Sequence, residues 1–186
     1  MKKVNLFLIA LLATALLNAQ NGVNINGVVW AETNVGEKGT FVANPVDFGN
    51  YYTWQEALTA CPKGWRLPTA NEIQSLFVKD KENFGWEKLN SIECFYVSDV
   101  ATGNKIFLPV AGRIDPFDAD KLNEFVTGDY WSSTEFGDHE SSANLDEGRE
   151  DNAHDLYLLI WEDGNREFGL GGGYKGYGSS VRCVKE

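Results

Sequence analysis

The sequence predicts an α+β domain in which two short helices pack on a small, twisted, mostly antiparallel sheet with long loops. Three observations predict this fold class. One strand-like segment opens the domain, two helix-start motifs follow it, and beyond residue 90 the chain reads as short strands separated by polar loops. This order differs from the regular alternation of strand and helix that builds a parallel α/β sheet. At roughly 150 residues per domain, a chain of 186 residues is one domain.

The composition is globular and acidic. Hydrophobic residues make up 43% of the chain, and 16 Lys and Arg stand against 27 Asp and Glu, for a formal net charge of −11. Nucleic-acid partners require a basic footprint, and anionic lipid surfaces attract basic segments. We therefore expect neither a nucleic-acid ligand nor adhesion to anionic lipid.

Residues 1–20 read as a secretory signal peptide rather than as part of the fold. Lys2 and Lys3 precede a nearly unbroken apolar run from Leu6 to Leu17, which is shorter than the roughly 20 residues that a membrane span needs. We expect residues 21–186 to form the single mature domain, without a transmembrane segment. The protein is predicted to be exported to the periplasm, the outer surface or the medium.

The segment Val23–Trp30 alternates as a strand does and is predicted to open the sheet. A loop rich in Gly and Asn follows it. Then Thr53–Glu56 and Thr69–Glu72 each have the form T-x-x-E, in which the Thr hydroxyl and the Glu carboxylate bond the free N–H groups of a helix start. These motifs predict two short helices.

Each predicted helix has one apolar face. In the first, the spacing i, i+3, i+4, i+7 places Trp54, Ala57, Leu58 and Cys61 together, before Pro62 and Gly64 end the helix. In the second, the apolar residues are Ala70, Ile73, Leu76 and Phe77. Five later segments are predicted to be strands: Glu93–Val97, Lys105–Val110, Asp129–Ser133, Leu156–Trp161 and Ser179–Val184. A glycine-rich loop, Asp163–Gly178, is predicted before the last of them.

Three cysteines, Cys61, Cys94 and Cys183, remain in the exported chain. An oxidising compartment lets two of them pair, and the spacing alone allows any of the three pairings. The sequence has no CxxC motif and only His139 and His154 as histidines, so we do not expect a zinc site.

Several motifs in a fixed order resemble a known family. They are Tyr51–Thr53, Ala60-Cys61-Pro62-Lys63-Gly64-Trp65-Arg66-Leu67-Pro68-Thr69, Leu108–Gly112, Tyr130–Thr134 and Ser180-Val181-Arg182-Cys183-Val184. Together they are similar to the Fibrobacter succinogenes major paralogous domain family of exported bacterial proteins. The resemblance extends from Gly27 to Lys185 and implies a C-type lectin-like fold. It also implies a disulfide between Cys61 and Cys183, with Cys94 free.

The resemblance implies a fold more than an activity, because lectin-like folds host many functions. The tripeptides by which C-type lectins bind sugar through calcium, Glu-Pro-Asn, Gln-Pro-Asp and Trp-Asn-Asp, are absent from the sequence. The pair of reactive cysteines that the related formylglycine-generating enzyme needs is not expected either, since the resemblance assigns two of the three cysteines to a structural disulfide.

Two weaker patterns have simpler interpretations. Gly171-x-Gly173-x-x-Gly176 matches a dinucleotide motif but no helix is predicted after it, so we interpret it as an inter-strand loop. The acidic run Asp146–Asp155 offers carboxylates to a calcium ion without the spacing that preorganises a calcium loop, and a solvated acidic loop is the default. No cofactor is expected, with calcium as the possible exception; its candidate ligands are Asp146, Glu147, Glu150, Asp151 and Asp155.

The candidate ligand-binding residues follow the fourth of these strands. Aromatic side chains beside Arg, Asn and Asp are a common recognition surface, because rings stack on sugar or peptide while polar groups orient the partner. We expect Trp161 to lie in the core and the tyrosines to lie in the glycine-rich loop, outside the core. The candidates are Asp163, Asn165, Arg166, Tyr174, Lys175 and Tyr177.

The sequence therefore predicts an exported, non-catalytic binding module of the adhesion type, which recognises a glycan or a protein ligand at the bacterial surface. The alternative is a structural or assembly subunit of a surface or fimbria-like structure. No catalytic residues are assigned. A carboxylate-based glycan hydrolase ranks third, since no sequence feature sets the pKa of one carboxylate against another.

Overall fold

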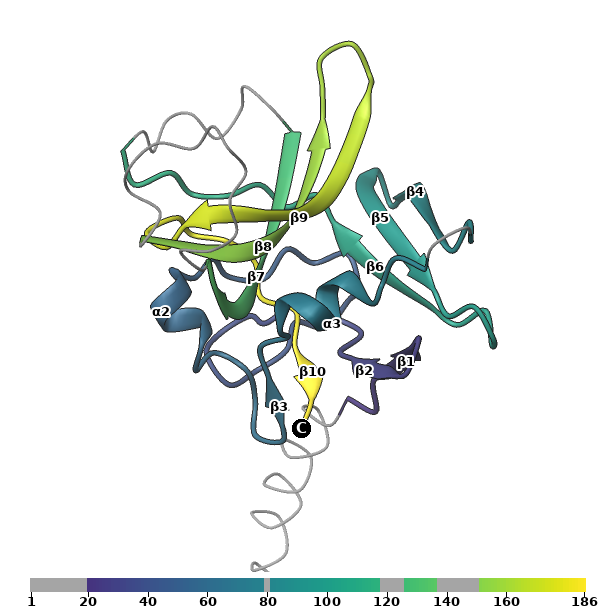
Figure 1. Ribbon diagram of the computed structural model, residues 1–186, viewed down its shortest axis with the longest axis horizontal. Helices are drawn as coiled ribbons and strands as arrows, with labels where there is room; N and C mark the ends of the chain where they lie inside the picture. Colours follow the sequence, from purple (N-terminus) through teal and green to yellow (C-terminus); the bar gives the residue numbers. More distant parts are fainter. Residues whose placement is uncertain (1–19, 79–80, 118–125, 137–150) are drawn as a thin grey trace, which may run out of the picture.

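A computed structural model describes residues 20–78, 81–117, 126–136 and 151–186. They form a small, mostly-β domain with three antiparallel sheets and two short helices (Figure 1). The α+β expectation is thus confirmed in part: both helices are present, but the predicted single sheet is three. The candidate signal peptide lies, except for Gln20, outside the described residues. No helix among the described residues is long and apolar enough to cross a membrane.

The first sheet joins both ends of the described chain. Its order is β1-β2-β10-β3, from β1 (Val23–Ile25), β2 (Val28–Trp30), β10 (Val184–Lys185) and β3 (Trp65–Arg66). The predicted single strand Val23–Trp30 is wrong: Asn26 and Gly27 have φ angles of 51° and 92° and form a two-residue turn between β1 and β2. Asn-Gly is the typical sequence of such a turn, because both positions need positive φ.

The two helices begin where the motifs predict and end earlier. Helix α2 spans Trp54–Ala57 and helix α3 spans Ala70–Gln74, each with its capping box formed. Thr53 and Thr69 each donate their backbone N–H to the Glu three residues later, at 2.9 and 2.8 Å. Cys61, predicted on the first helix, lies in the turn that follows α2.

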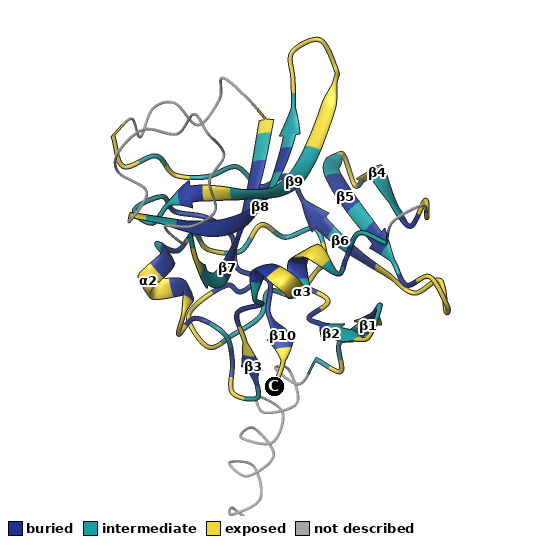
Figure 2. Ribbon diagram, viewed as in Figure 1, coloured by how far each residue is buried: buried dark blue, intermediate teal, exposed yellow. Residues whose placement is uncertain are grey.

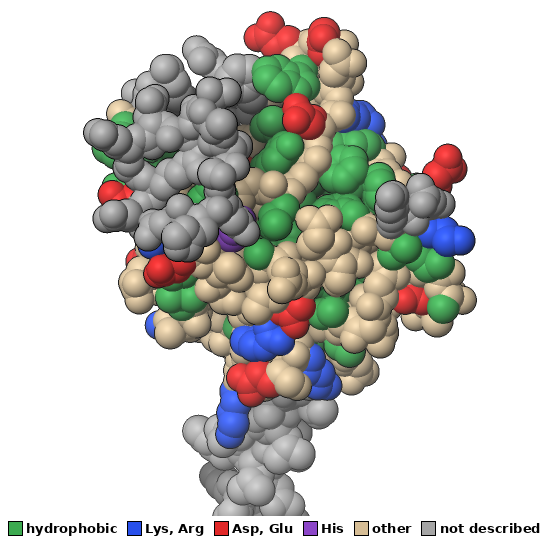
Figure 3. Space-filling model, in the orientation of Figure 1, with side chains coloured by type: hydrophobic (Ala, Val, Ile, Leu, Met, Phe, Trp, Pro, Cys, Tyr) green, Lys and Arg blue, Asp and Glu red, His purple; other side chains and the backbone are tan. Residues whose placement is uncertain are grey.

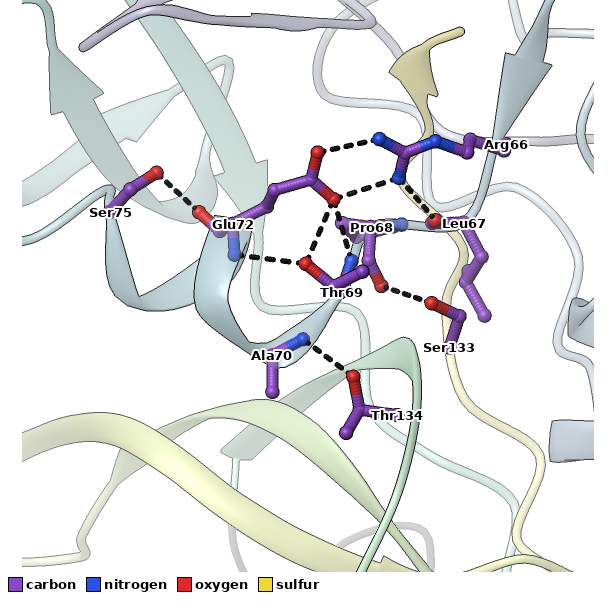
Figure 4. Close-up of polar contacts among 9 residues, drawn as sticks. All are labelled: Arg66, Leu67, Pro68, Thr69, Ala70, Glu72, Ser75, Ser133 and Thr134. Carbon is purple, nitrogen blue, oxygen red and sulfur yellow. Dashed lines mark hydrogen bonds and ion pairs between the residues drawn. The ribbon is translucent and has the colours of Figure 1, made fainter.

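Figure 4 shows that the start of α3 is a junction between elements. Arg66 donates two hydrogen bonds to Glu72, at 2.6 and 2.8 Å, and this pairing lowers the pKa of Glu72 to about 2. The backbone N–H of Ala70 donates to the Thr134 hydroxyl at 3.0 Å. The α3 N-terminus is thereby tied to β3 on one side and to the end of β7 on the other.

The second sheet has the order β4-β5-β6, with β4 (Phe84–Leu89), β5 (Ile92–Ser98) and β6 (Lys105–Pro109). Strands β5 and β6 match the predicted segments to within one or two residues. Strand β4 was not predicted, because its Gly-Trp-Glu-Lys centre lacks alternation and its residues are half-buried or exposed.

The third sheet, β7-β8-β9, is the largest, with β7 (Val126–Glu135), β8 (Asn152–Ile160) and β9 (Arg166–Tyr174). Strand β9 lies inside the segment predicted as a glycine-rich loop, so that prediction is wrong. Its glycines are explained by Tyr157 on the neighbouring strand β8. A Cβ at Gly169 would lie 3.1 Å from the Tyr157 ring, and a Cβ at Gly171 would lie 2.9 Å from the same ring. They leave room for cross-strand side chains rather than for loop motion.

The predicted last strand, Ser179–Val184, is only partly regular. Ser179 forms an isolated antiparallel bridge with Tyr52, and Ser180 forms a parallel bridge with Tyr130, before β10 begins at Val184. This segment therefore runs beside β7 and then enters the first sheet, and it connects two sheets.

Figure 2 shows buried residues on all three sheets and on both helices. One core cluster joins the inner face of the third sheet, through Tyr130, Leu156 and Leu158, to Ile73 of α3 and Phe95 of β5. A second cluster surrounds Trp131; its other members include Tyr52, Trp54, Trp65, Leu67, Val181 and Cys183.

The disulfide predicted from the resemblance is confirmed. Cys61 and Cys183 are bonded across a separation of 122 residues, and Cys94 is a free, buried thiol on β5. The bond fixes the turn after α2 to the segment that precedes β10. The two regions are the sides of the second core cluster.

Candidate functional site

The predicted ligand-binding residues divide into two groups at opposite ends of β9. Asp163, Asn165 and Arg166 lie at the tip of the β8–β9 hairpin, whereas Tyr174, Lys175 and Tyr177 lie at the other end. Strand β9 has nine residues, so at about 3.3 Å per residue its ends are about 26 Å apart. They do not form one site.

The polar residues at the hairpin tip interact with one another and with the second sheet. Asp163 accepts hydrogen bonds from the backbone N–H and the side-chain amide of Asn165, at 2.9 and 2.7 Å. Arg166 pairs with Glu93 of β5 at 3.0 Å and lies 5.6 Å from the ring centre of Trp86 on β4. Asp163 and Asn165 are thus parts of the hairpin turn, and Arg166 links β9 to the second sheet.

Trp161, predicted in the core, is 41% exposed, so that prediction is wrong. The apolar run of β8 ends at Ile160, and Trp161 is the first residue of the hairpin loop. The β8–β9 hairpin projects beyond the sheets on which it packs, so no core surrounds Trp161.

Aromatic and cationic side chains gather at the opposite end of β9. Phe117 is 78% exposed, and its ring centre lies 5.5 Å from that of Tyr174. Tyr174 in turn meets Tyr177 edge to face at 5.7 Å, and the guanidinium of Arg113 lies 4.5 Å from the centre of the Tyr177 ring. We call these four residues, Arg113, Phe117, Tyr174 and Tyr177, the aromatic cluster.

Two backbone segments hold the aromatic cluster in place. Ile114 and Gly178 exchange two backbone hydrogen bonds, at 2.8 and 2.9 Å, which join the segment after β6 to the segment after β9. The N–H of Tyr177 donates to the C=O of Tyr174 at 2.9 Å in a tight turn. Gly176 is required in this turn, because a Cβ there would lie 2.4 Å from the Tyr174 ring.

The two tyrosines differ in their surroundings. Tyr174 packs on the exposed Phe117, whereas Tyr177 packs against the second core cluster. The expectation that both tyrosines lie outside the core is therefore wrong for Tyr177. Its ring is shared between the core and the surface.

Lys175 lies between the tyrosines in sequence, but its side chain points away from the aromatic cluster, toward β7 and α2. Its ammonium lies 3.5 Å from a carboxylate oxygen of Glu135 and 4.9 Å from the centre of the Trp54 ring. The backbone C=O of Lys175 also accepts the N–H of Trp54, the first residue of α2. Lys175 thus ties α2 to the third sheet.

A buried acidic pair lies next to the aromatic cluster. Asp129 on β7 and Asp155 on β8 are 2% and 5% exposed, and in the strand register they are diagonal neighbours on one face of the sheet. Arg113 connects this pair to the cluster, since one of its guanidinium nitrogens lies 3.9 Å from Asp129 Oδ2. The Thr127 hydroxyl donates to the same oxygen at 2.9 Å.

Burial dominates the ionisation of this pair. It raises the pKa of Asp155 to about 8, with a further contribution from the charge of Asp129. Burial also raises the pKa of Asp129, while Arg113 and the Thr127 hydroxyl act in the opposite sense. Asp155 thus holds its proton at neutral pH, which the sequence did not reveal.

The calcium candidates do not form one loop. Asp155 lies within β8 and is buried, and Asp151 immediately precedes that strand and is exposed. The other three candidates, Asp146, Glu147 and Glu150, lie outside the described residues. Within the part of the chain that the structure describes, no group of three or more His, Cys, Asp or Glu side chains is arranged to hold a metal ion.

Sequence reasoning missed Phe117, Arg113 and Asp129 as site residues. Nothing in the Asp-Pro-Phe-Asp stretch marks Phe117 as a neighbour of Tyr174, because the contact depends on the backbone bridge between Ile114 and Gly178. Asp129 lies within the predicted strand Asp129–Ser133, two residues before Trp131. Side chains two residues apart point to the same face of a strand, and this spacing was the one sequence signal that Asp129 shares a face with Trp131.

The fold and the site together define a small, mostly-β, disulfide-bonded domain that presents one exposed aromatic ring and two half-buried tyrosines beside a buried acidic pair. No family model matches the chain, and no curated protein or solved structure is significantly similar to it.

Proposed function

We propose that this protein is an exported, non-catalytic binding module that recognises a glycan or a protein ligand at the bacterial surface through the aromatic cluster. The observation that carries the proposal is Phe117, an aromatic ring that is 78% exposed and supported from behind by Tyr174. Exposed aromatic side chains that lie together on a folded surface mark interaction sites more often than single exposed ones do.

The cluster has the geometry of a binding surface. Its rings come from two segments joined by backbone hydrogen bonds, so they are positioned before a ligand arrives. Preorganised aromatics contribute large contact area at a small cost in side-chain entropy. The flat face of Phe117 and the nearby Arg113 favour a glycan, since rings stack on the apolar face of a sugar and a guanidinium bonds its hydroxyls.

We propose a non-catalytic role because the two neighbouring carboxylates are buried. A general acid must come within hydrogen-bond reach of the atom that it protonates. Asp129 and Asp155, whose pKa values are both raised by burial, are covered by protein on all but a few per cent of their surface. We assign them to the support of Arg113 rather than to turnover.

We also propose that the fold is C-type lectin-like and that the chain is related to the Fibrobacter succinogenes major paralogous domain family. The disulfide that joins the turn after the first helix to the last strand segment supports this assignment. The two capping boxes, at the positions of the family-like motifs, support it too. Export follows the candidate signal peptide at residues 1–20.

The test is a binding screen on a panel of bacterial and host glycans and extracellular-matrix proteins, followed by affinity measurements on variants. We expect Phe117→Ala and Tyr174→Ala each to weaken binding by about 1–2 kcal/mol, with the melting temperature nearly unchanged for Phe117→Ala. Phe48→Ala is the matched control, since Phe48 is 38% exposed and outside the cluster. Equal affinities for all three variants would place the site elsewhere, and glycan turnover would refute the non-catalytic assignment.

A further inference from the structure

Strand β9 is an open edge of the third sheet. In the order β7-β8-β9 it pairs with β8 on one side along all nine residues, and no other described element pairs with its second side. Figure 1 shows the β8–β9 hairpin projecting beyond the rest of the domain, and Figure 3 shows hydrophobic side chains gathered beside the base of this hairpin. An unpaired strand edge is a row of backbone donors and acceptors that another strand can complete.

Two hydrogen bonds fix which residues of β9 point toward β8. The N–H of Trp161 donates to the C=O of Asn165 at 2.9 Å, and the N–H of Lys175 donates to the C=O of Asp151 at 2.7 Å. Both pairs follow the register of the β8–β9 ladder, which has no bulge. Bonded and non-bonded pairs alternate in an antiparallel ladder, so the odd-numbered residues of β9 bond to β8.

The even-numbered residues of β9 therefore direct their N–H and C=O groups outward. The central three are Phe168, Leu170 and Gly172, and no hydrogen bond among the described residues reaches their backbone. Gly172 is exposed, and the side chains of Phe168 and Leu170 pack inward against the first core cluster. Their backbone edge is left as the contact surface.

Two other sheet edges of this domain, those of β1 and β4, are protected in ways that β9 is not. Strand β1 has only three residues, and β4 carries the exposed Glu87 and Lys88. Short edges and exposed charges prevent pairing with a further strand. From Phe168 to Gly173, β9 has neither charge nor proline.

We propose that β9 pairs with β9 of a second copy of this chain, antiparallel and about a two-fold axis at Leu170. This register places Leu170 opposite Leu170 of the second copy and Phe168 opposite Gly172 of the second copy. All three outward residues of each chain then face outward residues of the other, and each pair exchanges two N–H···O bonds. The result is one continuous sheet across two copies.

Among the central residues of β9, this register sets no two aromatic rings opposite each other. Phe168 faces Gly172 of the second copy, which has no side chain and lies against the Phe136 ring of its own chain. The charged residues near the ends of β9 do not oppose the pairing. The Lys175 ammonium lies at Glu135 and Trp54 of its own chain, and the Glu167 carboxylate accepts the Tyr157 hydroxyl at 3.1 Å.

The net charge of −11 opposes association of two copies, so dimerisation should depend on the salt concentration. Repulsion between whole chains acts over long distances and is screened by salt, whereas strand hydrogen bonds are not. We therefore expect the dimer to strengthen as the salt concentration rises from 0.01 to 0.5 M. An interface built on surface ion pairs would weaken instead.

The first experiment is sedimentation equilibrium of the mature domain and of two variants at one position. Leu170→Pro removes the outward N–H without breaking a bond to β8, and Leu170→Ala is its matched control, since it removes similar side-chain packing but keeps the N–H. We expect Leu170→Pro to dimerise at least about tenfold more weakly than Leu170→Ala.

The second experiment tests the register and does not depend on the folding of the proline variant. Two Cα atoms in a bonded antiparallel pair are about 5.5 Å apart, within the range of a disulfide. Leu170→Cys should therefore give a covalent dimer under mild oxidation, and the exposed hairpin-loop variant Glu162→Cys should not. A monomeric wild type at all concentrations, or a dimer that neither Leu170→Pro weakens nor Leu170→Cys cross-links, would overturn the proposal.

Discussion

The carboxylate of Asp155 occupies the space that a side chain on Gly173 would need. A Cβ at Gly173 would lie 2.7 Å from Oδ2 of Asp155 and 3.1 Å from the ring of Trp131. The two strands that bear Asp155 and Gly173 are hydrogen-bonded neighbours, so neither backbone is free to withdraw. The absence of a side chain on β9 is thus what allows an acid to be buried on β8.

Gly173→Ala should destabilise the domain by about 1–3 kcal/mol, the usual cost of adding a methyl group to a packed site. The measurement is urea unfolding, with the unchanged Cm of a Glu162→Ala variant as a surface control. In an Asp155→Ala background the added methyl group loses its closest contact, so its cost should fall. Equal costs in the two backgrounds would show that Asp155 is not the obstacle.

Asp155 should make the protein less stable as the pH rises. Its pKa of about 8 in the folded state is above the ordinary value for Asp, so the folded protein holds a proton that the unfolded chain releases at lower pH. The stabilisation from this proton is complete below about pH 4 and is lost as the pH rises to 8. Asp155→Asn removes the titration, and its stability relative to wild type should increase across this window.

Thermal unfolding between pH 4.5 and 8.5 checks this prediction. Parallel melting curves of wild type and Asp155→Asn against pH would contradict it. Asp129→Asn is the companion variant: without the neighbouring charge, the pKa of Asp155 falls, so the loss of stability that Asp155 causes should level off at a lower pH in Asp129→Asn than in wild type.

The disulfide should be a major source of stability. The loop-entropy argument gives about 4–5 kcal/mol for a bridge that closes a loop of this length, here with a separation of 122 residues. Cys183→Ser should lower the free energy of unfolding by several kcal/mol, far more than Cys94→Ala. Non-reducing peptide mapping should find the Cys61–Cys183 peptide pair, and a bridge that contains Cys94 would contradict the structure.

Cys94 should be chemically silent in the folded protein. Its side chain is fully buried, and burial raises the pKa of the thiol to about 11, so the reactive thiolate is rare at neutral pH. A thiol reagent should label Cys94 only after denaturant is added, at the rate of unfolding. Rapid labelling of the native protein would show that β5 opens locally.

Arg182→Lys should be strongly destabilising despite the retained charge. The guanidinium of Arg182 is fully buried and donates to the side chain of Asn34 and to three backbone carbonyls, those of Ala31, Glu32 and Phe107. An ammonium cannot reach acceptors spread over this plane, so we expect a loss of about 2–4 kcal/mol. Arg166→Lys, at an exposed ion pair, is the control and should cost less than about 1 kcal/mol.

Local signals in the sequence predicted the parts of the fold that local chemistry determines. The T-x-x-E motifs located both helix starts, because a capping box is complete within four residues. The hydrophobic strands β5 and β8 were recognisable from their own residues. The β1–β2 turn had its signal in Asn26-Gly27, which the alternation of the flanking residues concealed.

The rest depended on contacts between distant segments. Glycine at 169 and 171 reads as loop until Tyr157 of the neighbouring strand is known to lie over both positions. The candidate site was predicted from neighbours in sequence, yet Arg166 and Tyr174 are at opposite ends of one strand. Phe117 joined Tyr174 only through the fold.

The path of the segment from Ser179 to Val184 determines when this protein becomes stable. That segment supplies Ser180 to the edge of β7, Cys183 to the disulfide, Val184 to the first sheet, and Arg182 to a hydrogen bond with Asn34, 148 residues earlier. A ribosome releases these residues long after β2. The nascent chain must therefore stay unfolded, and exposed to proteases and chaperones, until almost the whole domain has emerged.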